Sequence, residues 1–541
     1  MKRYIKTILP AAAMILSLGL PSCSSDLDVM PIDPNLQTKE RINSDNLLNK
    51  CYANLAVAGN SGPDGDCDID GLDGGTTGFV RQMFNANELT TDEAICAWGD
   101  PGIENFNFNT YDAQQPMLRG FYYRLYAGIS YCNQYIADFG AVDAQKTAEA
   151  RFLRALQYYL LLDGWGNVPF TTAVSSEKPQ QIKRADLYKW VESELLDVQN
   201  DLAEAKPEKK GEEGYGRVDK AAAWLLLARL YLNAEVYTGT PEWGKAAEYA
   251  KKVIDSPFKL YTTKKGNWSP YQQLFMGDNG INGASQECIF SVIQDGEKTH
   301  SYGTTLFLIA STTNATEIVN PDGKSVGMNT TEKWSGNRAR PDLIKKFFPQ
   351  TAPQVDAYQM TKEAKDDRAI FTGNGRELEN NDPSTFTDGY GVCKFNNWYT
   401  TGTAKNTKFP DTDFFFFRSA EAYLIYAEAT ARANGGTATA EGVGYLNQLR
   451  SRANASTKAG YTLDDICDEW SREFYFEGIR RPTLIRFGKF GGNTNYNWTW
   501  KGGAKNGRNI DKHYNLFAIP SSDLNANGNL QQNEGYKDNQ K

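Results

Sequence analysis

The chain has 541 residues, of which 40% are hydrophobic and 23% are charged, as in an ordinary folded globular protein. Its net charge is −8, so it lacks the basic excess that wholesale binding of nucleic acid requires. The chain is rich in aromatic residues, with 29 Tyr and 11 Trp, although core packing accounts for most such side chains in any protein.

The N-terminal segment has the layout of a secretory signal. Positive charge at Met1–Arg3 is followed by a short apolar run at residues 8–20, which is too short for a comfortable bilayer span. The run ends at Leu20-Pro21-Ser22-Cys23, an arrangement that resembles a bacterial lipobox. We therefore predict a signal peptide at 1–22, a tether lipidated at Cys23 over 23–44, and a folded domain at 45–541. The alternative is a cleaved signal in which Cys23 is incidental.

The remaining cysteines do not form a metal-binding pattern. Removing Cys23 leaves seven, an odd number that cannot pair completely within one chain. None lies in a Cys-x-x-Cys motif, so a zinc site is not expected. Some pairs could form disulfides in an extracytoplasmic compartment, but the sequence does not assign them.

Helical periodicity dominates most of the chain. Phe152, Ala155, Leu156 and Tyr159 recur at i, i+3, i+4 and i+7, and Asp219 is a plausible N-cap for the next strong pattern. Further patterns include Ile466, Trp470 and Phe474. The main helices are expected as neighbouring pairs: 120–139 with 147–163, 185–203 with 217–235, and 417–433 with 440–454. The fold class is therefore mainly α, with hairpins that resemble tetratricopeptide repeats; a generic helical bundle is the alternative.

The middle of the chain differs in composition. From about 260 to 416, Gly, Asn, Thr, Asp and Pro are frequent and strong helical patterns are scarce. Residues 287–292 read as a short strand, and 390–395 do so more weakly. Long loops in a compact protein usually carry function, so we expect a helical scaffold that displays a loop-rich binding half with few short strands.

Catalytic signatures are missing. His300 and His513 are the only histidines, and neither lies in a His-x-x-x-His pattern. Gly323-Lys324-Ser325 resembles the end of a phosphate-binding loop, but Ile318 occupies the position of the first glycine. Carboxylates are plentiful without any spacing that marks a catalytic pair. The sequence therefore predicts a protein that is not an enzyme.

One oxygen-rich stretch invites a metal interpretation. Asp278 and Asn279, with Asn282 and Gln286, could hold Ca²⁺, although the regular spacing of known calcium loops is absent. A plain Asn/Gly turn is the favoured interpretation, and no other cofactor is expected.

Six ordered segments span the predicted mature protein: 154–170, 216–234, 418–429, 446–453, 469–488 and 519–536. The first of them includes the exit turn Gly166-Asn167-Val168-Pro169. Together the six segments resemble the SusD-like (RagB/SusD) family of Bacteroidetes surface nutrient-binding lipoproteins, although Thr483 stands where the family usually has Asp. The acidic residues after Cys23 also look like the export tag of such lipoproteins.

The resemblance is strongest to the family's starch-binding founder and implies a glycan site. The aromatic arc of the founder's site corresponds to Trp98, Tyr302 and Trp334 in this chain. The polar residues of that site correspond to Asp73 and Arg81. Where the founder's site has a further asparagine, this chain has Pro101, whose side chain cannot make the hydrogen bond that an asparagine makes. Taken alone, each ring could serve the core, Asp73 could form a turn, and Arg81 could belong to a surface ion pair.

The resemblance further implies a role at the extracellular face of the outer membrane. The lipid on Cys23 would anchor the protein, and a SusC-like TonB-dependent transporter would receive the captured α-glucan oligosaccharide. The alternatives are capture of another glycan such as dextran, capture of peptides, or an endo-acting glycosidase suggested by aromatic loops and abundant carboxylates.

Overall fold

Amphipathic helices dominate the computed structural model, which describes residues 43–59, 62, 67–312 and 327–537. Cys23 and the predicted signal peptide lie outside these residues. The helices up to residue 255 are α1 (Ser44–Ala56), α2 (Phe79–Asn87), α3 (Ile103–Phe108), α4 (Pro116–Phe139), α5 (Ala144–Gly164), α6 (Arg184–Val198), α7 (Lys220–Leu232), α8 (Ala234–Thr238) and α9 (Trp243–Asp255). The later helices are α10 (Pro270–Gln273), α11 (Thr305–Ala310), α12 (Pro341–Ile344), α13 (Ala357–Ala364), α14 (Ala420–Ala433), α15 (Ala440–Arg452), α16 (Leu463–Phe474), α17 (Arg480–Arg486) and α18 (Ser521–Ala526).

Side-chain caps set where several of these helices begin. The Asp219 carboxylate accepts hydrogen bonds from Ala221 N and Ala222 N, which confirms it as the N-cap of α7. Thr462 and Asp465 form a capping box at the start of α16. Such side chains satisfy backbone N–H groups that have no partner within the helix.

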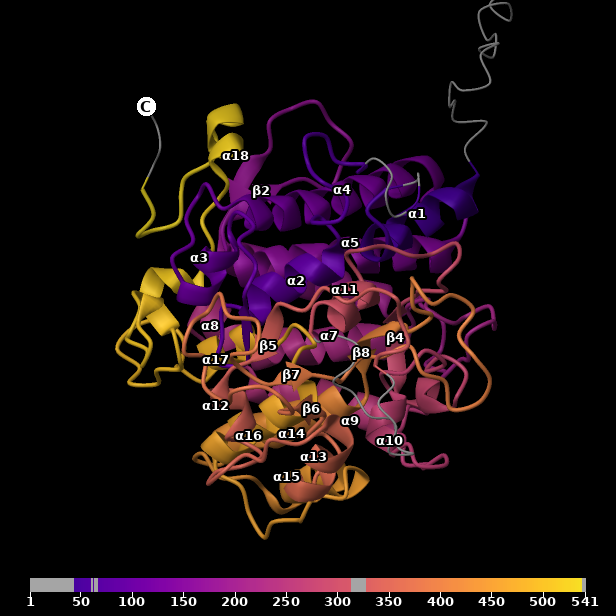
Figure 1. Ribbon diagram of the computed structural model, residues 1–541. Coiled ribbons are helices and arrows are strands. Elements are labelled where there is room, and N and C mark those ends of the chain that lie inside the picture. The colour runs from indigo at the N-terminus through magenta and orange to yellow at the C-terminus, as the bar shows by residue number, and fades with distance from the viewer. Residues whose placement is uncertain (1–42, 60–61, 63–66, 313–326, 538–541) are drawn as a thin grey trace, which may run out of the picture. The chain divides into compact units, whose positions relative to one another are not determined.

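The long helices pack as successive neighbours. Contacts run from α4 to α5, then to α6, α7, α9, α14 and α15. Figure 1 shows α4, α5, α7, α9, α14 and α15 one below the other. The predicted helical hairpins are thereby confirmed, with ends shifted by a few residues. The helix expected over 217–235 divides at Asn233 into α7 and α8.

Short strands form two-stranded antiparallel sheets. The strands are β1 (Ala94–Cys96), β2 (Val168–Phe170), β3 (Gln180–Ile182), β4 (Cys288–Val292), β5 (Asn337–Ala339), β6 (Phe371–Thr372), β7 (Gly391–Val392) and β8 (Phe414–Arg418), with 3₁₀ turns at η3 (Ala284–Gln286), η4 (Lys501–Gly503) and η5 (Lys512–Asn515). The strand expected at 287–292 is confirmed as β4, whereas only two residues of 390–395 are in β7.

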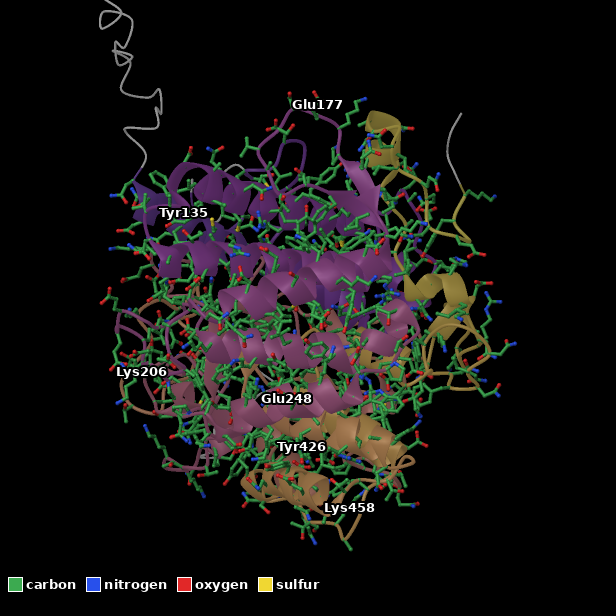
Figure 2. The ribbon with its side chains drawn as sticks, turned by 180° about the vertical axis from the view of Figure 1, so that it is seen from behind. Tyr135, Glu177, Lys206, Glu248, Tyr426 and Lys458 are labelled. Carbon is green, nitrogen blue, oxygen red and sulfur yellow. The ribbon has the colours of Figure 1, made fainter. Side chains whose placement is uncertain are left out.

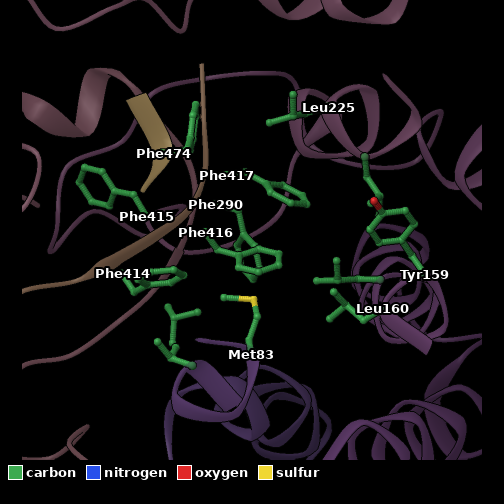
Figure 3. Packing of buried hydrophobic residues seen from close by; sticks show 14 of the residues in the cluster. Met83, Tyr159, Leu160, Leu225, Phe290, Phe414, Phe415, Phe416, Phe417 and Phe474 are labelled. Atoms are coloured by element: carbon green, nitrogen blue, oxygen red, sulfur yellow. The ribbon is translucent and has the colours of Figure 1, made fainter. Parts of the chain in front are cut away.

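The β4–β8 pair lies in the middle of the core. Four consecutive phenylalanines of β8, Phe414–Phe417, are all buried, so both faces of the strand are covered. Figure 3 shows these rings beside Phe290 of β4, with Met83 on one side and Phe474 on the other. This strand therefore joins the α2–α5 side of the core to the α14–α16 side.

Among the described residues, Cys51, Cys67, Cys96, Cys132, Cys288 and Cys467 are free thiols, and all of these except Cys67 are buried. The disulfides that the sequence left open are therefore not formed among them. Within the described part of the chain, no helix is both long and apolar enough to cross a membrane.

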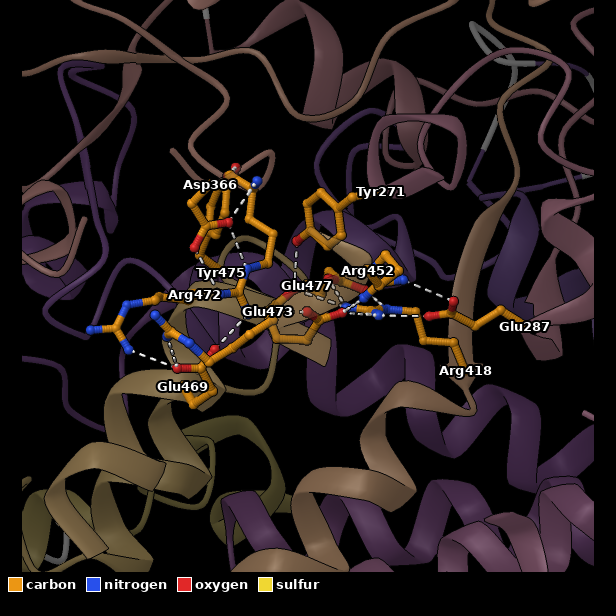
Figure 4. Close-up of polar contacts among 12 residues, drawn as sticks. Tyr271, Glu287, Asp366, Arg418, Arg452, Glu469, Arg472, Glu473, Tyr475 and Glu477 are labelled. Atoms are coloured by element: carbon orange, nitrogen blue, oxygen red, sulfur yellow. Dashed lines mark hydrogen bonds and ion pairs between the residues drawn. The ribbon is translucent and has the colours of Figure 1, made fainter. Parts of the chain in front are cut away.

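A buried network of arginines and carboxylates ties α15 and α16 to β4 and β8 (Figure 4). Glu473 Oε1 accepts from Arg418 Nη1 at 2.6 Å and also pairs with Arg452, while Arg368 Nη1 donates to Glu469 Oε1 at 2.7 Å. All five of these side chains have no solvent exposure. Although burial opposes ionisation, the surrounding arginines lower the pKa of Glu469 and of Glu473 to about 2.

We predict that this network makes the fold acid-sensitive. Because the pKa of each carboxyl is lower in the folded state, the stabilisation is complete above about pH 4.5 and is lost as the pH falls toward 2. Thermal melts between pH 6 and pH 3 are expected to show a steep decline for the native chain. Glu473→Gln should be less stable at pH 6, by about 3–5 kcal/mol, and should show a shallower decline. Glu235→Gln, at an exposed position of α8, should follow the native profile, and an unchanged slope in Glu473→Gln would contradict the account.

Candidate functional site

The β1–β5 pair brings two distant tryptophan-bearing segments together. Cys96 pairs with Asn337, and Ala97 N extends the ladder by donating to Gly336 O at 2.9 Å. Trp98 therefore leaves β1 at the same end at which residues 334–336 enter β5. This antiparallel register places Trp98 and Trp334 at one edge of the loop-rich half.

Helix α11 joins the remaining ring to this edge. Trp334 N and Ser335 N donate to Ala310 O, the last residue of α11, at 2.8 and 2.9 Å. Tyr302 precedes the same helix, and its ring lies 6.0 Å from that of Trp334 at an interplanar angle of 45°. The two rings pack against Leu306 and Ala310 as a small cluster. They thus form an angled surface rather than a flat one.

Trp98 is held from three sides. Its ring meets Phe307 of α11 edge-on at 6.1 Å, and the guanidinium of Arg81 lies 5.4 Å from the indole. The third side is the bare backbone of Gly336, whose φ is +112°. A Cβ at Gly336 would lie 2.1 Å from Trp98 Nε1, so only glycine permits this placement.

The structure thus gathers the three predicted rings around α11, and each of Trp98, Tyr302 and Trp334 is half-buried. Each ring retains some accessible area, while its contacts fix its orientation. Trp334 Nε1 donates to Glu332 Oε2 at 2.7 Å, which further fixes that indole. Half-buried rings with fixed orientations can offer apolar faces at little cost in side-chain entropy.

Asp73 lies beside Tyr302. Gly75 lies between them: a Cβ added there would lie 3.2 Å from Asp73 Oδ1 and 3.8 Å from Tyr302 Cβ. The missing side chain of Gly75 therefore lets Asp73 and Tyr302 lie close to each other. Asp73 Oδ1 accepts from Thr76 N at 2.9 Å, as expected of a turn former, but the residue is exposed. The structure therefore shows the turn and places the carboxylate near Tyr302, while the role of Asp73 in glycan binding stays a prediction.

Arg81 lies at the site, but most of its side chain is buried. It is 8% exposed, lies against Trp98 and Phe307, and donates from Nη1 to Gly75 O at 3.0 Å. Burial lowers its pKa, and nearby acidic groups, Asp100 first, oppose that effect. Here Arg81 supports the indole and the Asp73 turn, and it is not part of an ordinary surface ion pair.

Three residues of the site were not predicted from the sequence. Phe409 packs on Tyr302 at 5.2 Å, His300 lies over Phe409 at 4.5 Å, and Lys408 Nζ lies 5.3 Å from the Tyr302 ring. Phe409 is the one aromatic residue of the polar segment 402–411, and an aromatic residue isolated in a polar loop is a signal that could have found it.

Beyond Trp98 the surface is hollowed into a cleft of about 440 Å³. Polar groups of Asp100, Asn105 and Ser384 line it together with the indole and Pro101. A larger cavity of about 1170 Å³ lies elsewhere, but its aromatic lining, Tyr215 and Phe258, is buried. The Trp98 cleft thus differs from this larger cavity, because its polar groups adjoin a half-buried ring.

The four candidate calcium ligands, Asp278, Asn279, Asn282 and Gln286, are engaged in hydrogen bonds with protein groups. Asp278 accepts from Asn282 Nδ2 and from Thr400 through both N and Oγ1, so both its carboxylate oxygens have donors. The Asn279 amide is bonded to Leu274 and Asp413, and Gln286 Nε2 donates to Leu260 O. Among the described residues, no group of three or more His, Cys, Asp or Glu side chains has the arrangement of a metal site. The calcium site stays a prediction.

Sequence comparisons return one family. A model described as the SusD family matches residues 286–536, and one described as "Starch-binding associating with outer membrane" matches 27–232. The starch-binding protein SusD of Bacteroides thetaiotaomicron is 40% identical over 576 residues, covering 99% of this chain and all of that protein. A SusD-like protein of Bacteroides ovatus is 25% identical over 440 residues, 74% of this chain and 72% of its own length.

Solved structures with this fold include two proteins that are named for glycan binding. The surface glycan-binding protein A of Bacteroides uniformis matches with a TM-score of 0.65 at 20% identity, covering 92% of this chain and 99% of that one. A laminarin-binding SusD-like protein matches with a TM-score of 0.65 at 20% identity, covering 91% and 99%. At this level of identity the similarity establishes the shared, mainly helical fold.

We predict that Gly336→Ala will disable the site without removing any ring. The new methyl group would overlap Trp98 Nε1 and displace the indole. Affinity electrophoresis in amylopectin gels should show reduced retention. Gly402→Ala is the matched control, because Gly402 also has positive φ, +86°, but a Cβ there meets no atom within 4 Å. Equal retention of the two variants would contradict the role assigned to Trp98.

Proposed function

This chain belongs to the SusD family, as the order of its signature segments predicted, and on that premise we propose that it binds a starch-like α-glucan at the Trp98–Tyr302–Trp334 site. The observation that carries the proposal is the convergence of three half-buried rings around α11, from segments far apart in the chain. The 40% identity to a starch-binding relative favours this class of glycan.

The rings suit the apolar faces of pyranose sugars. Sugar rings carry C–H groups on their faces, and indole and phenol rings offer matching flat surfaces. Burial of one such face contributes roughly 1–3 kcal/mol by area, before the costs of ordering the ligand. The 45° angle between Tyr302 and Trp334 favours a curved chain such as an α-1,4-glucan over a flat ribbon. Three such contacts, reduced by the ordering costs, give weak binding. Weak binding suits a protein that captures a glycan and then releases it.

Polar groups around the rings supply orientation. The exposed carboxylate of Asp73 adjoins Tyr302, while Asp100, Asn105 and Ser384 line the cleft beside Trp98. Carboxylates and amides form directional hydrogen bonds with sugar hydroxyls. Pro101 contributes no such bond, whereas Asn105 in the same cleft carries a side-chain amide, whose Nδ2 also donates to Thr110 O at 3.3 Å.

We predict selective retention by starch that depends on the rings. In affinity electrophoresis, retention should be stronger by amylopectin than by dextran or levan, and a peptide pool should not compete. Trp98→Ala and Trp334→Ala should each weaken maltoheptaose binding by about tenfold or more, since 1.4 kcal/mol corresponds to a factor of ten. Trp190→Ala, another half-buried tryptophan on α6, is the control for general destabilisation.

Two outcomes of this experiment would overturn the proposal. If Trp98→Ala and Trp334→Ala bind maltoheptaose as tightly as Trp190→Ala, the rings are not the site. If highly purified protein releases reducing sugar from amylopectin, the protein acts as a glycosidase and not as a binding protein.

We further propose that the protein works at the outer-membrane surface as a lipoprotein that passes its ligand to a SusC-like TonB-dependent transporter. The family model's description and the lipobox-like sequence at Cys23 support this placement. The tagged full chain is expected to sediment with outer membranes and to co-purify with a β-barrel transporter of its host. Cys23→Ser should release it into the soluble fraction. Membrane retention of Cys23→Ser would argue against the anchor, and absence of a transporter from the native pull-down would argue against the partner.

A further inference from the structure

A second groove, of about 800 Å³, runs along α9 where this helix packs against α7 and α14. Figure 2, which shows the molecule from the side opposite to Figure 1, places Glu248 of α9 and Tyr426 of α14 near each other on this side. Trp98, Tyr302 and Trp334 are not among its lining residues, so the groove is separate from the site described above.

Small residues of α9 form the hollow. Gly244, Ala247 and Lys251 follow one another at i, i+3 and i+7 and therefore lie on one face of the helix. A Cβ at Gly244 would meet no atom within 4 Å, so the space above this residue is open. Two aromatic side chains, Trp224 of α7 and Tyr426 of α14, line the same groove.

Both rings are half-buried and fixed by hydrogen bonds. Trp224 Nε1 donates to Gln199 Oε1 at 3.1 Å. Tyr426 donates its hydroxyl to Glu441 Oε2 at 2.5 Å, and Tyr445 packs on it at 5.1 Å with an interplanar angle of 90°. Because the polar edges are already bonded, what these rings can offer a ligand is apolar surface in a fixed orientation.

The charged groups of the groove are largely paired with one another. Lys251 Nζ lies 2.6 Å from Asp255 Oδ1, and Lys252 Nζ lies 3.3 Å from Glu248 Oε1. Such exposed pairs contribute little to stability but leave neither sign of charge in large excess. They present hydrogen-bond donors and acceptors to a neutral, hydroxyl-rich molecule, rather than a field that attracts an ion.

From the fixed rings, the open floor at Gly244 and the balanced polar rim, we propose that the α9 groove is a second saccharide-binding site. This second site goes beyond the function proposed above. The proposal rests on that function only for the choice of maltoheptaose as the test sugar. Since the groove and the Trp98–Tyr302–Trp334 site have no lining residue in common, one polysaccharide could engage both sites, or two sugar chains could bind at once. Two weak sites that engage one polymer raise its overall retention by increasing the effective concentration.

Selective ¹⁵N labelling of tryptophan tests this directly, because each indole N–H reports on its own surroundings. On titration with maltoheptaose, the Trp224 indole resonance should shift, and should still shift in a Trp98→Ala/Trp334→Ala variant. Gly244→Leu, which fills the hollow without removing a contact, should weaken the Trp224 response at least about tenfold and leave the Trp98 response intact. Gly444→Leu is the matched control on α15, where a Cβ also meets no atom within 4 Å.

The outcomes separate the two proposals. A Trp224 resonance that does not move while Trp98 saturates overturns the second site and leaves the first intact. Shifts of Trp224 without any shift of Trp98 or Trp334 overturn the function proposed for the α11 site instead. If the Trp224 resonance responds to maltoheptaose equally in Gly244→Leu and in Gly444→Leu, the groove is not the sugar site. If Trp224 shifts only when a peptide is added, the groove is a protein-docking surface and not a sugar site.

Discussion

The loop-rich half of this protein depends on buried side chains that satisfy its irregular backbone. Carbonyl groups outside helices and sheets still need donors when they are buried. Arg340, which is fully buried, donates to the carbonyls of Ala94, Leu89 and Asn107 and also pairs with that of Thr499, so one guanidinium joins four segments. Asn279 and Lys394 act similarly toward other loops. Without these donors the loops would have to open to water, and the binding half would lose its shape.

The same kind of contact positions the binding site. Arg338 donates to Gly336 O at 2.8 Å and thereby fixes the backbone against which Trp98 lies. Arg124 donates to Thr77 O, and Arg81 to Gly75 O, at the loop that carries Asp73. Gly78 and Gly303 then allow the chain before α2 to approach the chain before α11, where Arg81 N donates to Gly303 O at 3.0 Å. The helical stack supplies the rigid support, and polar side chains transmit that rigidity to the loops.

This division explains what the sequence could reveal. Helices such as α5 and α7 carry their periodicity locally, so they were predicted within a few residues. β8 was missed because four consecutive phenylalanines show no alternation and adjoin a polar, glycine-rich region. The rings at 98, 302 and 334 came from resemblance, since nothing local in a single sequence predicts the β1–β5 pairing; Arg340 and Ala94, which bond across it, are 246 positions apart. The support that Arg81 gives to Trp98, and the place of Phe409, depend on those same long-range contacts.

The central claim is that three fixed aromatic faces around α11 receive a sugar chain. A crystal structure of the protein soaked with maltoheptaose tests it most directly. The account predicts glucose rings lying over Trp98, Tyr302 and Trp334 at van der Waals distance, about 4 Å, with the protein side chains unmoved. A sugar bound elsewhere while these three rings remain uncovered, or rings that must reorient to meet it, would contradict the account.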